Sequence, residues 1–523
     1  MSEHKAIFKS ASVIGIFTVV SRITGFLRDV LMANIFGTSF YAQAFFVAFK
    51  IPNLFRNAIG EGAGNAAFVP VFCECLAQKK RSDFLKLANT VLLLVAGLAA
   101  LISLMGVVFS PLIIRLIAPG FLENFSQFEL TIQLTRILFP YLILVALSAC
   151  LASVANAQNS FAVPASSSAV FNIVLILCMI MIAGMSSGRA IYFLCIGVLL
   201  AGVFQVCVQI PPLLKTGIGL SAGIYTDFFR RDSVRKIARL AGPRVVGASV
   251  YQMNVFVDTI FASLALFVGQ GAIAAIYYAN RIIQLPFAII GIAFANAALP
   301  AMSASSSCGD MARFRKTLVF SMKATFLGIL PAMIGILVLS APLVEVIFQR
   351  GHFDAYSAAI TSRAVFFYAF GLIAYTGTRL LSSAFYALQD TVTPVKISFA
   401  AFLVNIVLNA LFIFVFRFGI AGLALASVFS AIMNFVFLYV ILAKKTGFHF
   451  SGEFGVFILK AVIASLIMAV FILSLWHNSF LFLPGFIRMA LVIILGILVY
   501  AAALVLLKVR ELKEVLPWFR KSA

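Results

Sequence analysis

Residues 172–175 of this 523-residue chain read Asn-Ile-Val-Leu, and the same four residues return at positions 405–408. Further short matches keep this spacing of about 230 residues and follow the same order along the chain. They are Phe45-Phe46 with Tyr277-Tyr278, Asn65-Ala66-Ala67 with Asn296-Ala297-Ala298, Gln158 and Pro164 with Gln389 and Pro394, and Asp29 with Asp258. A constant spacing over many matches indicates an internal duplication, so the sequence predicts two related halves.

The composition of the chain is that of a membrane protein. Hydrophobic residues make up 63% of the sequence, and the mean hydropathy is +1.10. Charged residues make up only 11%, against roughly 25% in soluble domains. A chain with so few polar residues cannot cover a water-facing surface, which excludes a soluble multidomain enzyme.

Long apolar stretches recur along the whole chain. A spanning helix needs about 20 mostly apolar residues, and on this criterion we expect about 14 membrane helices. They lie near residues 10–34, 41–60, 87–110, 133–156, 163–184, 190–212, 240–266, 272–299, 318–340, 360–386, 396–416, 420–442, 456–475 and 487–507. The first stretch is interrupted by charges and has no small-residue cleavage site, so we expect a retained helix rather than a signal peptide.

The helix count and the duplication together predict the architecture. Each repeat holds six of the expected helices, and an even number returns the chain to the same side of the membrane, so the two halves are parallel. We therefore expect an all-α polytopic membrane protein with two six-helix lobes around a central cavity and two further C-terminal helices. The expected domains are an N-terminal lobe at 1–220, a C-terminal lobe with a leading amphipathic linker at 221–445, and the two last helices with a basic tail at 446–523.

Most of the net charge of +22 comes from lysines and arginines in the loops and the C-terminal tail. Cations gather in alternate loops, at residues 79–86, 215–239, 313–316 and 444–445, and in the C-terminal tail, while the loops between are nearly free of them. By the positive-inside rule this places both termini in the cytoplasm. No single basic face remains for nucleic acid.

The seven cysteines and four histidines show no metal-ligand spacing, so we expect buried cysteines and no metal site.

Several charged residues lie within or beside the expected spans. The first half supplies Arg22, Arg28, Asp29, Lys50, Arg56 and Glu61, and the second half supplies Asp258 and Arg281. A charge at the bilayer centre costs roughly 2.5–3.5 kcal/mol, so such residues normally face an interior cavity. The surplus of cations suits an anionic ligand, and the forked donors of arginine suit phosphate. The alternatives are that these side chains reach the headgroups from helix ends, that Arg28 only pairs with Asp29, and that Asp258 is capped by its neighbours.

Two asparagines in the second half could bind a cation. Asn405 and Asn409 lie one helical turn apart in an apolar stretch, and with Asp258 they offer oxygen ligands that sodium accepts. Hydrogen bonds between helices are an equally good interpretation of such polar residues.

The charged motifs resemble those of one family. The stretch from Ser21 to Asp29, Ser-Arg-Ile-Thr-Gly-Phe-Leu-Arg-Asp, resembles a signature of the MurJ (MviN) lipid II flippases. The stretches 44–56, 61–63, 67–70, 277–281 and 389–395 are similar to further family motifs. The resemblance covers essentially the whole chain.

This resemblance implies a fold, a function and a set of site residues. It implies a member of the multidrug/oligosaccharidyl-lipid/polysaccharide exporter superfamily that moves a lipid-linked peptidoglycan precursor, lipid II, across the bacterial cytoplasmic (inner) membrane in cell-wall biogenesis. The last two helices would form a groove for the lipid tail. Substrate would bind at Arg22, Arg28, Arg56 and Arg281, with Asp29, Lys50 and Glu61 shaping or gating the cavity. An ion site would comprise Asp258, Asn405 and Asn409, with sodium coupling and no other cofactor.

The sequence also departs from the family and leaves rival functions. Gln43, Asn280 and Gln284 stand where many members have acids, so the cavity holds fewer acids. Rival substrates are another polyprenyl-diphosphate-linked glycan or a drug, although cationic drugs would favour an acidic cavity. We find no cluster of acid/base residues in a long loop, so we do not expect an enzyme. The expected partners are lipid II, membrane lipids and cell-wall synthesis proteins, with no nucleic acid.

Overall fold

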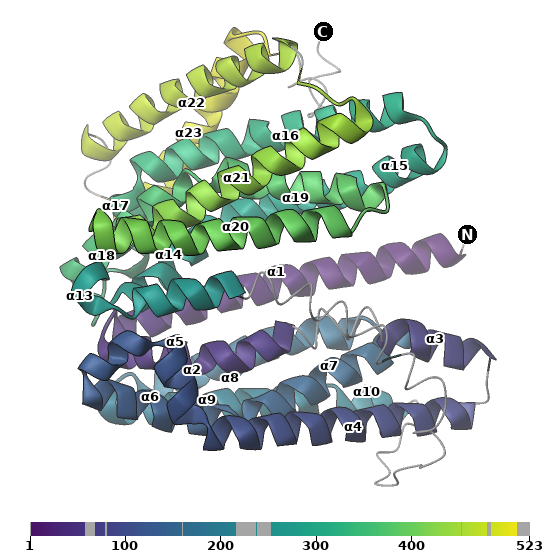
Figure 1. The fold of residues 1–523 in the computed structure, drawn as a ribbon, viewed down its shortest axis with the longest axis vertical. Coiled ribbons are helices and arrows are strands. Elements are labelled where there is room, and N and C mark those ends of the chain that lie inside the picture. The colour runs from purple at the N-terminus through teal and green to yellow at the C-terminus, as the bar shows by residue number, and fades with distance from the viewer. Residues whose placement is uncertain are drawn as a thin grey trace. The chain divides into compact units, whose positions relative to one another are not determined.

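The computed structural model describes residues 2–57, 68–78, 81–158, 160–215, 237, 253–450, 452–478 and 483–509. Every regular element among these residues is a helix (Figure 1). This confirms the expected all-α class.

Contacts divide the chain into two compact units. Unit 1 comprises residues up to Leu264 together with Arg350–His352, and unit 2 comprises the remainder. The helices of unit 1 are α1 (Ser2–Phe36), α2 (Phe40–Asn57), α3 (Val69–Gln78), α4 (Arg81–Val108), α5 (Ser110–Ile117), the 3₁₀ turn Pro119–Glu123, α6 (Phe125–Leu138), α7 (Tyr141–Ala157), α8 (Ala162–Ile182), α9 (Ser187–Cys207), α10 (Ile210–Lys215) and the helix Met253–Ala262.

Unit 2 contains the second half of the chain and both C-terminal helices. Its helices are α13 (Ala265–Val268), α14 (Ala272–Pro286), the π-helix Phe287–Ile292, α15 (Ala293–Ser307), α16 (Met311–Val338), α17 (Ser340–Phe348), α18 (Ala355–Ala369), α19 (Leu372–Ala387), α20 (Val392–Ala410), the π-helix Leu411–Val415, α21 (Ile420–Thr446), α22 (Gly452–Asn478) and α23 (Gly485–Leu506).

The described helices agree in position with the expected spans, except that residues 240–252 of the expected span 240–266 lie outside the described residues. Among the described residues, ten helical segments are long and apolar enough to cross a membrane, or eleven if α18 and α19, which are bent by 47°, count as one span. Three of the ten join consecutive elements: Phe125–Ala157, Ala272–Ser307 and Val392–Val415. Helices α1 and α2 are not among the ten, and these are the two that hold Arg22, Arg28, Asp29 and Lys50. The expected total of about 14 stays a prediction.

Helix packing repeats between the two units. In unit 1, α2 packs on α6, α4 on α7, and α8 on α9. The corresponding pairs in unit 2 are α14 on α18, α16 on α19, and α20 on α21. Because equivalent helices find equivalent neighbours, the packing agrees with the duplication that the sequence predicts.

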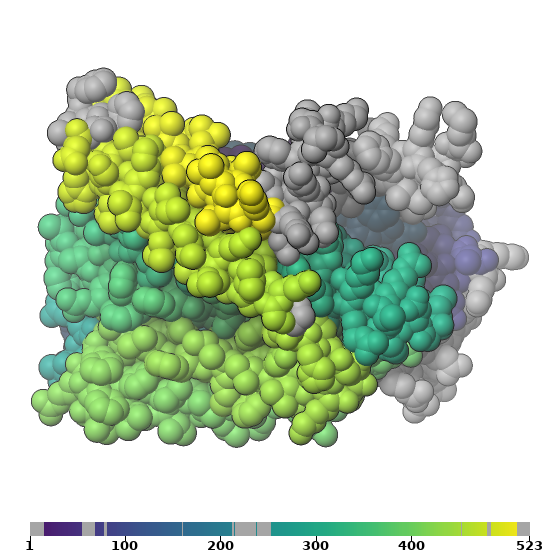
Figure 2. Space-filling model, turned by 90° about the horizontal axis from the view of Figure 1, so that it is seen from above, coloured from purple at the N-terminus to yellow at the C-terminus, as the bar shows by residue number. Residues whose placement is uncertain are grey.

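The boundaries of the units differ from the expected domains. The expected boundary near residue 220 lies outside the described residues, and unit 1 extends through the helix Met253–Ala262, which opens the second repeat. Helices α22 and α23 are not separate, because they pack on each other and on α16 and α17 of unit 2. Figure 2 shows α22 and the yellow α23 side by side along one edge of this unit.

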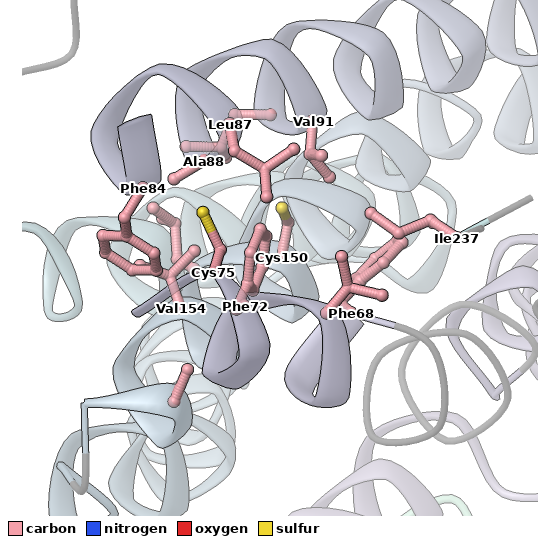
Figure 3. Packing of buried hydrophobic residues seen from close by; sticks show 14 of the residues in the cluster. Phe68, Phe72, Cys75, Phe84, Leu87, Ala88, Val91, Cys150, Val154 and Ile237 are labelled. Atoms are coloured by element: carbon pink, nitrogen blue, oxygen red, sulfur yellow. The ribbon is translucent and has the colours of Figure 1, made fainter. Parts of the chain in front are cut away.

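The core of unit 1 between α3, α4 and α7 is built from rings and small apolar side chains (Figure 3). Phe72 and Phe84 meet edge to face, with ring centroids 6.0 Å apart. Cys75 and Cys150 are buried in this cluster as free thiols. Both therefore pack as small hydrophobic residues, as the sequence predicts. Cys195 is also buried, but the prediction is wrong for Cys73, Cys207 and Cys308, which are exposed.

Candidate substrate-binding site

The Arg28 guanidinium on α1 is held by two neighbours. Its Nε and Nη2 donate to Oδ1 of Asp29 over 3.1 and 2.7 Å, and its Nη1 donates to Oδ1 of Asn172 over 2.9 Å. The side chains of Arg28 and Asp29 are 15% and 3% exposed. A buried charge needs a partner and hydrogen bonds, and this arrangement supplies both.

Asn172 joins α8 to α1 a second time. Its Nδ2 donates to the backbone oxygen of Ser21 over 3.1 Å. Gly25 permits this close approach, because a Cβ at that position would lie 3.3 Å from the Nδ2 of Asn172. Asn172 is not among the site residues that the sequence predicts, although its match with Asn405 shows a polar position repeated in an apolar segment.

Arg22 has a different environment from Arg28. It lies on α1, and its side chain is exposed. With the residues that the structure describes, it makes no hydrogen bond or ion pair. Asp29 is buried at 2% exposure although it lies seven residues from Arg22. Arg22 is thus accessible on α1, while Arg28 is fixed by its partners.

A second charged group of unit 1 lies between α2 and the helix Met253–Ala262. Lys50 Nζ donates to Oγ1 of Thr259 and lies 3.4 Å from the backbone oxygen of Val255. Asp258 is close enough to interact electrostatically with Lys50. Lys50 and Asp258 were both predicted from the sequence, but their pairing was not. The Arg56 side chain and Glu61 lie outside the described residues.

Arg281 of unit 2 lies on α14 between two polar side chains of the same helix. Its Nη2 donates to the hydroxyl of Tyr277 over 2.7 Å, and its Nη1 lies 3.5 Å from Oε1 of Gln284. The guanidinium carbon is 4.7 Å from the centroid of the Tyr277 ring, a cation–π contact. A π-helix, Phe287–Ile292, follows α14 directly, and such turns are frequent at functional sites.

The two asparagines proposed for an ion site are paired with each other in unit 2. Nδ2 of Asn409 donates to Oδ1 of Asn405 over 3.0 Å, and both residues are buried. Asp258 belongs to unit 1, so its placement against these asparagines stays a prediction. In the part of the chain that is described, no three His, Cys, Asp or Glu side chains gather as a metal site.

The site residues thus form two local arginine centres, one in each unit, with their guanidinium groups oriented by neighbouring side chains. Arginine presents five donors in a planar fork, which matches the oxygens of a phosphate. Groups of this kind bind and orient an anion without needing a nucleophile or a general base. The donors of these centres are therefore of the kind that suits an anion.

Comparison with known proteins identifies the family. The model of the family "Lipid II flippase MurJ" matches residues 32–494. The chain belongs to the MurJ lipid II flippase family. Relatives in this family include the probable lipid II flippase MurJ of Buchnera aphidicola, which is 31% identical over 99% of this chain and 100% of its own length. The lipid II flippase MurJ of Burkholderia cenocepacia is 31% identical over 88% of this chain and 89% of its own length.

Solved structures agree with the MurJ assignment. A lipid II flippase MurJ in an inward closed conformation has a TM-score of 0.78 and 26% identity, and the match covers 94% of this chain and 97% of that one. An inward-facing multidrug resistance MATE family transporter of the MOP superfamily has a TM-score of 0.67 over 82% of this chain and 94% of its own, at 14% identity. The second likeness shows the fold alone. Together they confirm the expected fold class.

Proposed function

We propose that this MurJ family member moves lipid II from the cytoplasmic to the outer leaflet of the bacterial cytoplasmic membrane by alternating access. The observation that carries the proposal is the family match over residues 32–494. The arginine centres of the two units support it, because the diphosphate of a lipid-linked precursor is the anion that such donors suit.

In this proposal each site residue has a role. Arg22, Arg28 and Arg281 clamp the diphosphate, and Asp29 and Asn172 hold the Arg28 fork in place. Arg56, Glu61 and Lys50 shape or gate the cavity. Translocation breaks no bond of the substrate, so the protein acts as a transporter and not as an enzyme.

The lipid tail needs an apolar surface outside the cavity. Helix α22 presents an exposed apolar face made of Ile463, Leu466, Ile467 and Val470. We propose this face of α22 as the place where the polyprenyl chain rests, since burying its apolar surface there is favourable.

The topology and the driving force complete the proposal. Cytoplasmic termini follow from the positive loops, and accessibility of single introduced cysteines from either side tests them.

Sodium coupling rests on the oxygens of Asp258, Asn405 and Asn409. If sodium binds there, it should raise the thermal stability of the wild type relative to potassium, and Asn409→Leu should remove that difference.

The central test is depletion of this protein, followed by measurement of lipid II in the outer leaflet. We expect exposure to fall when no other flippase is present, and unchanged exposure would contradict the proposal. Arg22→Ala and Arg281→Ala should insert normally but fail to restore growth, whereas Arg115→Ala, an exposed arginine at the end of α5, should restore it.

Binding assays separate the rival substrates. Purified protein should bind lipid II more tightly than a polyprenyl diphosphate carrying a different glycan. Equal affinity for both would favour the broader function of a polyprenyl-linked glycan exporter.

A further inference from the structure

We propose that Tyr277 is a positioning residue that sets the place and orientation of the Arg281 guanidinium and thereby the affinity for the lipid diphosphate. This inference rests on the proposed function. Nothing in the sequence motifs assigns Tyr277 such a role, because a tyrosine in an apolar helix is usually a packing residue.

The contacts of Arg281 point to this role. Tyr277 lies one helical turn before Arg281 on α14, and it touches the guanidinium both through its hydroxyl, at 2.7 Å, and through its ring, at 4.7 Å from the centroid. Gln284, one turn after Arg281, contacts the opposite Nη at 3.5 Å. The guanidinium is therefore held between two side chains of its own helix, with the shorter contact on the Tyr277 side.

The equivalent positions of the first half show what the hydroxyl adds. Phe45 matches Tyr277 and Phe49 matches Arg281 in the duplication. Phe45 and Phe49 stack on each other, with ring centroids 5.6 Å apart and an interplanar angle of 11°. A ring thus packs on the side chain one turn later in both halves, but only the ring that faces a guanidinium carries a hydroxyl.

This difference matters because an arginine side chain has many rotamers. A phenyl ring can attract a guanidinium over its face, but it does not select the direction in which the N–H groups point. A hydroxyl acceptor at 2.7 Å does select it, because hydrogen bonds to charged donors are short and directional. Tyr277 would therefore reduce the ordering that Arg281 must undergo when the substrate binds.

The test measures lipid II affinity of the full-length protein in detergent micelles, with Tyr277→Phe as the main variant. This change keeps the ring and removes only the hydroxyl. We expect lipid II binding to weaken by roughly three- to tenfold, with an unchanged melting temperature. The matched control is Tyr278→Phe, because Tyr278 is fully buried and packs on the rings of Phe348 and Phe353. It should bind lipid II like the wild type.

Combining changes at Tyr277 and Arg281 tests whether Tyr277 acts by positioning the guanidinium or only by packing. In an Arg281→Lys background, which keeps the charge and loses the fork, Tyr277→Phe should cause no further loss of affinity. Wild-type affinity in Tyr277→Phe, or an equal loss in the wild-type and Arg281→Lys backgrounds, would overturn the inference. If the wild-type protein itself binds no lipid II, the proposed function fails instead, so the two failures are distinguishable.

Discussion

Oδ1 of Asn172 on α8 accepts a hydrogen bond from Nη1 of Arg28 on α1 over 2.9 Å. The same carboxamide donates to the backbone of α1 at Ser21. One side chain of α8 therefore fixes both the path of α1 and the orientation of its buried arginine.

Replacing Asn172 by leucine should impair the protein through Arg28. The change keeps the approximate size of the side chain but leaves one guanidinium donor and the Ser21 oxygen without this partner, at a cost of about 1–3 kcal/mol. We expect a lower melting temperature in detergent and poor complementation of a depleted strain. The control is Ser167→Ala on α8, whose hydroxyl bonds, among the described residues, only the backbone of its own helix at Pro164. Equal behaviour of the two variants would contradict the assigned role of Asn172.

Removing the ammonium of Lys50 should destabilise the protein, because Asp258 would lose a nearby positive charge. Lys50→Met deletes the cation that lies near Asp258 and bonds Thr259, so we expect a destabilisation of about 3 kcal/mol. Adding Asp258→Asn removes the remaining charge and should restore part of the loss, as measured by thermal unfolding. If the double variant loses more stability than the two single variants lose together, the two charges do not compensate each other.

Two glycines on α4 should respond in opposite ways to alanine. A Cβ at Gly106 would lie 1.9 Å from the ring of buried Phe139, whereas a Cβ at Gly97 meets nothing within 4 Å. Gly106→Ala should therefore cost about 1–3 kcal/mol through overpacking. Gly97→Ala should be neutral or slightly stabilising, since alanine favours a helix over glycine by up to about 1 kcal/mol. Melting temperatures of the two purified variants check this, and a tolerated Gly106→Ala would mean that Phe139 can move aside.

The charge of Asp390 should make stability depend on pH at the acid end. Burial alone would raise the pKa of Asp390, but hydrogen bonds from Lys445 and Thr393 outweigh it and lower the pKa to about 2. The unfolded value is about 4, so the charge stabilises the fold above about pH 4 and its contribution is lost as the pH falls towards 2. Lys445 is about half exposed, so we expect no more than about 1 kcal/mol.

Asp390→Asn isolates this charge, because an amide oxygen can still accept the hydrogen bond from the backbone of Thr393. The variant should melt below the wild type at pH 7, and the difference should shrink at pH 3. Lys445→Met should reduce the pH dependence of the wild type in the same way. A difference that stays constant from pH 7 to pH 3 would exclude the ion pair as its cause.

Several parts of the site could be predicted from the sequence because they are local. Arg28 and Asp29 are neighbours, and Asn405 and Asn409 lie one turn apart, so their contacts follow from helix geometry. The contact of Arg281 with Tyr277 is equally local, but the sequence did not show that the tyrosine hydroxyl would turn towards the guanidinium. The partner of Arg28 on α8 lies 144 residues away, and no local pattern indicates it.

The sequence by itself determined the membrane class, the duplication and the charged residues of the site. The membrane class and the charged residues follow from one segment at a time, because about 20 apolar residues are enough to favour a spanning helix whatever lies beside it. The duplication follows from the constant spacing between matching segments. Only the tertiary structure decided that Asn172 holds Arg28, that Lys50 meets Thr259, and that the helix Met253–Ala262 belongs to unit 1. These features depend on which helices lie side by side, and in a membrane that choice is made by close packing and hydrogen bonds between segments distant in sequence, which hydropathy does not report.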